Sequence, residues 1–316
     1  MRDCFGREVD YLRISVTDRC NYRCLYCMPP EGVVKLSHGD MMTLEEMAEV
    51  VRAAAPLGIR KVRLTGGEPL VRRGLPSLVR EIRAVPGIEE IAMTTNGALL
   101  APMAAELKEA GLQRVNISLD TLNADKFARI TRLGSADDVW RGIHAAAACG
   151  LTPLKLNVVL IGGFNDDEIP ALAALARNHP VEVRFIELMP MLPGAGFGKE
   201  AYLPCSVVLE KVPELVPDRT AGVAQLYRFP EGAGRVGLIS PLSHQFCGRC
   251  NRLRLTADGC LKPCLHSPEE IPLRGLHGEA LTQAIKEAIS RKPRQHGALS
   301  CDELSEAGRQ MNQIGG

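Results

Sequence analysis

Along the first 190 residues, short β-branched runs alternate with longer amphipathic stretches. The runs are rich in Val, Ile and Thr and are bounded by Gly, Asn or Asp, which is typical of strands. We therefore predict six strands, at residues 11–17, 61–65, 90–94, 114–119, 154–160 and 181–187.

The intervening stretches have the apolar spacing of helices. Thr43 followed by Glu46 forms a capping box, so a helix is expected to begin there and run toward Gly58. Further helices are predicted at residues 102–110, 136–149 and 166–178, and a later one at 281–289.

Six strands separated by helical stretches predict parallel pairing through right-handed crossovers. This α/β order suits either an incomplete βα barrel or a doubly wound sheet, and both bind ligands where the strands end. Polar and Gly-rich residues follow the predicted strands at 18–27, 66–69, 94–97, 118–120 and 187–189. The functional site is therefore expected at that edge.

The alternating pattern ends at a turn-rich linker, residues 190–196, and four prolines follow, at 204, 213, 217 and 230. We place a domain boundary near residue 225. The predicted domains are a core at residues 1–225 and a C-terminal region at residues 226–316, within which the second cysteine group lies.

The composition is that of an ordinary globular protein. Of the 316 residues, 46% are hydrophobic and 24% are charged, and Lys and Arg total 38 against 37 Asp and Glu, giving a net charge of +1. This balance argues against a nucleic-acid polymer as partner. No apolar run approaches the roughly 18 residues of a membrane span, and no leader is recognisable, so a cytoplasmic location is expected.

The chain has 11 cysteines, and in a reducing compartment clustered cysteines indicate metal binding more often than disulfides. Cys20, Cys24 and Cys27 have the spacing C-x3-C-x2-C. Zinc usually takes four ligands, and this group offers three. A [4Fe-4S] cluster held by three thiolates keeps one iron open for a ligand, which fits the spacing better.

Cys247, Cys250 and Cys264 form a second group, C-x2-C-x13-C. A zinc ribbon remains an alternative here, with Cys260 or His266 as the fourth ligand. Arg252 and Arg254 follow the second cysteine, and in an extended segment both would face one side. Guanidinium groups at that spacing suit phosphate oxygens. Cys4, Cys149, Cys205, Cys260 and Cys301 are expected to be free thiols.

The first group resembles the signature of the radical S-adenosylmethionine (SAM) superfamily. Tyr26 stands at the usual aromatic position before the third cysteine, and Gly66-Gly-Glu-Pro69 is similar to that superfamily's SAM motif. We expect its glycines to let backbone carbonyls approach the SAM ammonium group, since no Cβ intervenes.

The order of motifs resembles one family within this superfamily, the GTP 3′,8-cyclases. The similar segments include 12–21, 65–69, 94–97, 116–120, 184–189, the second cysteine group and the Ile314-Gly-Gly316 end. The resemblance implies an incomplete (β/α)6 barrel whose open side is closed by a C-terminal cluster-binding region. It also implies a lyase that converts GTP to (8S)-3′,8-cyclo-7,8-dihydroguanosine 5′-triphosphate via a 5′-deoxyadenosyl radical, in molybdenum cofactor biosynthesis.

The resemblance further implies a set of ligands for each cofactor and for the substrate. One [4Fe-4S] cluster would be held by Cys20, Cys24 and Cys27, and a second by Cys247, Cys250 and Cys264. Cys264 is preferred to Cys260 because the sequence around it matches the family. The implied SAM contacts are Tyr26, Gly67, Ser118 and Met189. The implied GTP contacts are Arg13, Arg63, Thr94, Lys155, Arg252, Leu253 and Arg254.

Gly315 and Gly316 have two interpretations. Residues without a Cβ can thread into a narrow active site, as the family implies, or form an activated C-terminus as in ubiquitin-like sulfur carriers. The family also implies an electron donor, a downstream enzyme that makes cyclic pyranopterin monophosphate, and a homodimer.

Two rival functions remain open from the sequence. One is another radical SAM enzyme with an auxiliary cluster and a different substrate. The other is a non-enzymatic protein whose C-terminal cysteines form a zinc ribbon.

Overall fold

The six predicted strands form the centre of one continuous sheet. In the computed structural model, which describes residues 1–33, 36–37, 39–191, 197–297 and 305–315, they pair in chain order and run parallel. Their bounds are β1 (Tyr11–Ser15), β2 (Lys61–Thr65), β3 (Glu90–Thr95), β4 (Arg114–Ser118), β5 (Leu154–Leu160) and β6 (Val181–Glu187).

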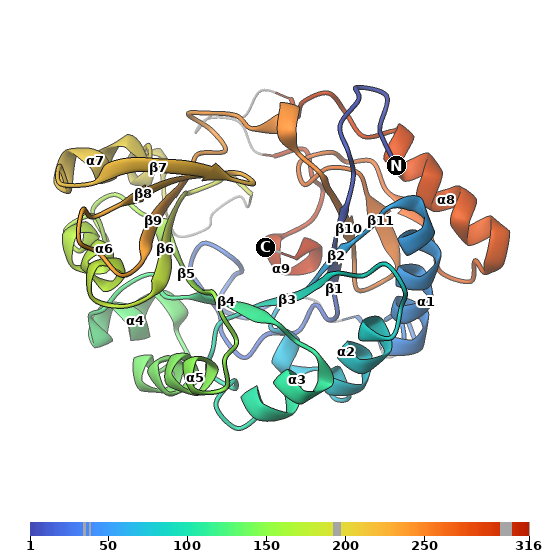
Figure 1. Cartoon of the computed structure of the whole chain (residues 1–316), viewed down its shortest axis with the longest axis horizontal. Helices are drawn as coiled ribbons and strands as arrows, with labels where there is room; N and C mark the ends of the chain where they lie inside the picture. The colour runs from blue at the N-terminus through green and yellow to red at the C-terminus, as the bar shows by residue number, and fades with distance from the viewer. Residues whose placement is uncertain (34–35, 38, 192–196, 298–304, 316) are drawn as a thin grey trace.

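Chain order along the sheet decides between the two architectures left open above. A doubly wound sheet reverses its strand order at a switch point, whereas β1 to β6 follow one another without reversal. The sheet curves around the centre of the molecule, and most of the helices lie outside it (Figure 1). The expected incomplete barrel is therefore confirmed.

Later segments extend both edges of this barrel. β10 (Arg252–Leu255) pairs parallel with β1, and β9 (Arg235–Ile239) pairs parallel with β6. The outer strands β11 (Cys260–Lys262), β12 (Ile271–Pro272), β8 (Ala224–Arg228) and β7 (Val216–Ala221) are antiparallel. The predicted boundary near residue 225 lies inside β8 and remains a prediction.

The helices on the outer face confirm the main helical predictions. The capping box at Thr43 begins α1, and the helix at the predicted 281–289 is α8, which packs on α1. The helices α2, α4, α7 and α9 were not among those named from the sequence. The bounds are α1 (Leu44–Ala54), α2 (Leu75–Arg83), α3 (Ala104–Ala110), α4 (Ala124–Thr131), α5 (Ala136–Ala148), α6 (Ile169–Asn178), α7 (Ser206–Lys211), α8 (Gly278–Ser290) and α9 (Met311–Ile314).

Alternation along the strands separates the core from the interior of the barrel. Leu12 and Ile14 on β1, and Val62 and Leu64 on β2, belong to the buried hydrophobic core. Arg13, which lies between Leu12 and Ile14, faces the opposite side of the sheet, because successive side chains alternate. The inner face is consequently polar.

The last described residues lie inside the curved sheet. Figure 1 shows α9 and the end of the chain at its centre. Ile314 and Met311 pack there with Met189 and Leu265. Within the described part of the chain, no helix combines the length and hydrophobicity needed to cross a bilayer.

Candidate active site

The first cysteine group lies on the loop that follows β1. Cys20, Cys24 and Cys27 are free thiols, and the backbone N–H of Cys27 donates to the Cys24 carbonyl at 2.9 Å. Burial raises the pKa of Cys20 to about 11 and that of Cys27 to about 12, and the pKa of Cys24 is also raised, by burial and then by the charges of Cys27, Asp120 and Cys20. Three partly buried thiols that influence one another fit a cationic polynuclear centre, which binds thiolates.

The Gly66–Pro69 motif packs directly against this loop. The N–H of Gly67 donates to the Thr17 carbonyl at 2.8 Å, and that of Glu68 to the Arg19 carbonyl at 2.8 Å. A Cβ on Gly67 would clash with the Arg19 carbonyl. Close contact with the cysteine loop is therefore one reason for a glycine at position 67. It adds to the reason expected from the sequence, which is close approach of backbone carbonyls to the SAM ammonium group.

Glu68 joins this motif to the loop after β3. Its buried carboxylate accepts hydrogen bonds from the Thr95 hydroxyl at 2.6 Å and from the Asn96 N–H at 2.7 Å. The Asn96 amide in turn donates to the Asn21 side chain at 2.7 Å, beside Cys20. Burial raises the pKa of Glu68 to about 7. Two segments that the sequence analysis singled out are thereby held together.

The four residues assigned to SAM all lie at the carboxyl end of the barrel strands. Tyr26 donates its hydroxyl to the Asp120 carboxylate at 2.7 Å, Gly67 follows β2, Ser118 ends β4, and Met189 follows β6. Among the described residues, Met189 is the member of this set that lines the large cavity inside the barrel.

That cavity has a volume of about 370 Å³. Six of the seven residues assigned to GTP line it, and so do all three cysteines of the second group. The seventh, Leu253, does not: its side chain is 1% exposed and packs in the core, since it alternates with Arg252 and Arg254. The six lining residues are Arg13, Arg63, Thr94, Lys155, Arg252 and Arg254.

Register across the sheet aligns the basic residues in a row. Arg254 pairs with Arg13 and Arg13 with Arg63; Arg63 pairs with Ala92 on β3, and Ala92 pairs with Arg114 on β4, so that Arg114 lies two strands beyond Arg63 in the same row. Each residue of a row projects from the same face of its strand. The structure thus adds lining residues that the sequence analysis did not assign to the site: Lys61, Arg114, Asn116, Asn157, Arg184 and Lys292. For Lys61, Arg114 and Arg184, a basic residue within a strand was a visible signal.

The charged groups of the cavity are only partly neutralised. Glu182 pairs with Lys155 at 3.0 Å and with Arg184. Burial and the nearby Arg184 charge lower the pKa of Lys155 to about 8, although Glu182 opposes this. Burial likewise lowers the pKa of Arg63 to about 10. This excess of positive charge suits an anionic ligand.

Several buried polar atoms of this cavity have no hydrogen-bond partner among the described residues. They are the Nε atoms of Arg63 and Arg252 and the Oδ1 atom of Asn157. Buried donors and acceptors are normally paired, so such atoms indicate a missing polar ligand. Two donors with one acceptor fit a molecule that carries both phosphate oxygens and N–H or O–H groups.

In the second cysteine group, Cys250 lies beside cationic side chains. The Lys292 ammonium group is 3.4 Å from its sulfur and donates to the carbonyls of Arg252 and Pro263, both at 2.8 Å. Burial alone would raise the pKa of Cys250, but the charges of Lys292 and Arg252 lower it to about 7. A lowered pKa favours the thiolate that metal binding requires.

Cys260 and Cys264, the two candidates for the third cysteine ligand of the second group, differ in their position relative to the cavity. Cys264 lines the cavity together with Cys247 and Cys250, whereas Cys260, on β11, is not among its lining residues. No three His, Cys, Asp or Glu side chains in the described ranges converge as ligands of one metal ion.

Gly315 is buried inside the barrel, where a Cβ would clash with the Thr65 hydroxyl. Arg254 donates to the Gly315 carbonyl and, at 3.3 Å, to that of Ile314. This placement agrees with a residue threaded into a narrow site rather than with an accessible terminus. Gly316, Cys301 and linker residues 192–196 lie outside the described residues.

Comparison with family models divides the chain into two matched regions. Residues 14–176 match the radical SAM superfamily, and residues 181–298 match the family described as Molybdenum Cofactor Synthesis C.

Curated relatives are similar over the whole length. A GTP 3′,8-cyclase of Pelotomaculum thermopropionicum is 52% identical over 328 residues, and one of Moorella thermoacetica is 51% identical over 330 residues. A third, of Alkaliphilus oremlandii, is 49% identical over 321 residues. In all three comparisons, 100% of this chain and 100% of the relative are covered.

Solved structures share the fold at low sequence identity. The crystal structure of Streptococcus suis SuiB has a TM-score of 0.64 at 14% identity, covering 91% of this chain and 66% of that one. Methylornithine synthase (PylB) has a TM-score of 0.53 at 20% identity, covering 66% and 64%. These likenesses concern the fold alone.

Proposed function

Because this chain belongs to the radical SAM superfamily and, within it, to the GTP 3′,8-cyclase family, we propose that it converts GTP to (8S)-3′,8-cyclo-7,8-dihydroguanosine 5′-triphosphate, the first step of molybdenum cofactor biosynthesis. The observation that carries this proposal is the single cavity in which the row of basic side chains meets the second cysteine group.

The cofactors of the proposed reaction are two [4Fe-4S] clusters and SAM. Cys20, Cys24 and Cys27 hold the first cluster, and Cys247, Cys250 and Cys264 hold the second. Tyr26, Gly67, Ser118 and Met189 are the SAM contacts. When bound, the first cluster and SAM would supply the 5′-deoxyadenosyl radical that the proposed conversion of GTP requires.

The chain's own task in this reaction is to bind and orient GTP. Arg13, Arg63, Lys155 and Arg254 bind the phosphates, supported by their charge and by the unpaired Nε of Arg63. Thr94, Arg252 and the backbone of Leu253 complete the contacts. Holding GTP in this cavity, which the proposed SAM contact Met189 also lines, brings the reacting atoms together.

Gly315 and Gly316 are the catalytic residues of the proposal. The position of Gly315 between Thr65 and Arg254 supports a direct role beside the substrate. Deleting both glycines should abolish turnover and leave the iron content unchanged. Full turnover by the truncated protein would reject this role.

The remaining parts of the proposal concern the cellular setting. The protein works in the cytoplasm, receives electrons from a donor protein and delivers its product to an enzyme that makes cyclic pyranopterin monophosphate. It forms a homodimer, and its core and C-terminal region divide near residue 225.

Anaerobic reconstitution followed by assay with SAM and GTP tests the function. We expect about eight irons per chain, 5′-deoxyadenosine and a guanine-derived cyclic product in equal amounts. SAM cleavage without the cyclic product would assign the enzyme to another substrate, and zinc in place of iron would reject the enzyme altogether.

A further inference from the structure

We propose that Arg309 is a positioning residue for the C-terminal segment, defined here as residues 305–315. Its contacts with Asp258 and Glu270 fix the start of α9, so that Gly315 is held beside Arg254. This inference rests on the proposed function, since it concerns how the catalytic glycines reach the site.

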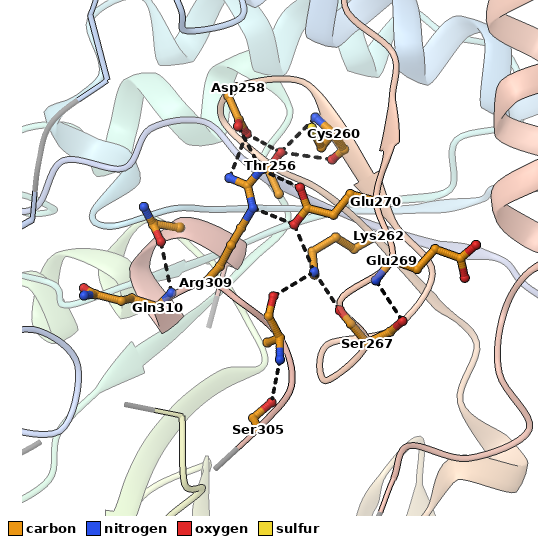
Figure 2. A network of polar contacts seen from close by, with 12 residues as sticks. Thr256, Asp258, Cys260, Lys262, Ser267, Glu269, Glu270, Ser305, Arg309 and Gln310 are labelled. Carbon is orange, nitrogen blue, oxygen red and sulfur yellow. Dashed lines mark hydrogen bonds and ion pairs between the residues drawn. The ribbon is translucent and has the colours of Figure 1, made fainter. Parts of the chain in front are cut away.

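Arg309 binds two carboxylates at once. Its Nε and Nη2 atoms each donate to Glu270 at 2.6 Å, and its Nη1 and Nη2 atoms donate to Asp258 at 3.0 and 2.8 Å (Figure 2). The guanidinium is 18% exposed, and both partners are partly buried. Two bidentate ion pairs fix the direction of a side chain as well as its position.

Lys262 attaches the same segment through its backbone. Its ammonium group is fully buried and donates to the Ala307 carbonyl at 3.2 Å, to Glu270 at 3.0 Å and to the Ser267 carbonyl at 2.8 Å. Figure 2 shows Glu270 between Lys262 and Arg309. A Lys ammonium has three donors, and here all three have acceptors.

The turn between β10 and β11 positions Asp258. Thr256 donates its hydroxyl to this carboxylate at 2.5 Å, and the same hydroxyl accepts the N–H of Cys260 at 2.8 Å. The carboxylate that receives Arg309 is thus fixed to a hairpin of the main sheet. That hairpin also contains Arg254, which donates to the Ile314 and Gly315 carbonyls. One hairpin therefore holds both ends of residues 309–315.

Between these attachments, the segment contacts the first cysteine loop. The Asn312 side-chain amide donates to the Asp18 carbonyl at 3.0 Å. Only one turn of helix, α9, separates Arg309 from the glycines. A displaced Arg309 would move Asn312 and Gly315 together, because a helix as short as α9 cannot absorb a shift at its start.

The test compares Arg309→Ala with wild type in anaerobically reconstituted protein. We expect kcat for the cyclic product to fall by at least about tenfold, because small misplacements of reacting groups are costly, while the Kd for GTP changes by less than about twofold. Hydrogen exchange of the 305–315 amides should become at least about tenfold faster. Arg309→Lys, which keeps the charge but not both bidentate pairs, should give intermediate values.

Arg291→Ala is the matched control. Arg291 also pairs with two carboxylates, Glu269 and Glu287, but its side chain is 51% exposed and neither partner belongs to the C-terminal segment. This variant should leave kcat, iron content and exchange unchanged. If Arg309→Ala does not fold, Asp258→Asn, which keeps the Glu270 pair, is measured instead and should show the same direction of change.

Two outcomes would overturn the inference: unchanged exchange in the 305–315 amides, or faster exchange with normal kcat. If wild type itself makes no cyclic product, the proposed function fails, and hydrogen exchange alone then decides whether Arg309 positions the segment. The two failures are therefore distinguishable.

Discussion

Lys155 is the residue of the cavity whose charge should respond most clearly to pH. Its pKa is lowered to about 8, so the ammonium group is charged below that pH and neutral above it. An anion binds the charged form, and GTP affinity should therefore fall as pH rises through about 8. The total loss should be roughly 10-fold to 100-fold, as for a hydrogen bond to a charged group. Equilibrium dialysis with GTP, without SAM, measures it.

Two variants make this pH prediction specific. Lys155→Arg should bind GTP with little change above pH 8, because a guanidinium stays protonated. Lys61→Arg is the control, since its hydrogen bond to Asp10 raises the pKa of Lys61 and that cation is already charged. A fall in affinity that persists in Lys155→Arg would assign the pH dependence to another group.

At the residue scale, some site residues could be named from sequence motifs, whereas others became apparent only from the register between strands. The two cysteine groups were named from their spacing, and Arg13 and Arg63 from the resemblance to a known family. Arg114 and Arg184 were visible as basic residues in strands, but their place in the cavity depends on which residues of neighbouring strands lie opposite one another. The register between two strands depends on how the whole sheet packs, and it cannot be inferred from the sequence of one segment alone.

At the scale of elements, the end of β2 and the cysteine loop form one tightly packed unit. Gly67→Ala places a Cβ against the Arg19 carbonyl, which is backbone and cannot rotate away. We expect a loss of about 1–3 kcal/mol in the free energy of unfolding, as for overpacking, and less iron after reconstitution. Urea unfolding and iron analysis measure these two effects.

Gly248→Ala is the appropriate comparison for that variant. Gly248 also lies beside a cysteine, Cys247, but a Cβ there would meet nothing within 4 Å. It should keep its stability and iron content. Equal losses in both variants would mean that glycine flexibility, rather than close packing, matters in these loops.

Elements of the first half were predicted more completely than those of the second. The six strands have strong β-branched patterns, and three of them have the predicted bounds, whereas β12 spans only two residues. The short helix α4 was not named from the sequence, although the Asn123 side chain caps it and Phe127 and Ile130 are buried on one side; at eight residues it is too short to form without packing on its neighbours.

At the scale of the whole molecule, residues 1–225 should not form a stable unit alone. Such a fragment lacks β9 and β10 and exposes both edges of the six-stranded barrel. We expect it to aggregate or to be digested rapidly by protease, whereas the full chain should unfold in one calorimetric transition. A fragment that unfolds cooperatively would support an independent core domain.

The parallel barrel could be predicted from element order, but its extended edges could not. Nothing local in the sequence around Arg252 indicates that it pairs with Tyr11, since contacts between such distant residues depend on the complete fold. The same limit applies to the C-terminal segment, whose ion pairs join residues from three separate stretches.

The pairing of β1 with β10 also affects how the protein is made. During translation β1 emerges first, and its neighbour β10 follows after roughly 10–50 seconds at ordinary synthesis rates. Throughout that interval one edge of β1 has no partner and can pair with another nascent chain. The yield of native protein should therefore depend on how fast ribosomes complete the segment that contains β10, and on chaperones that bind the unpaired edge of β1 in the meantime.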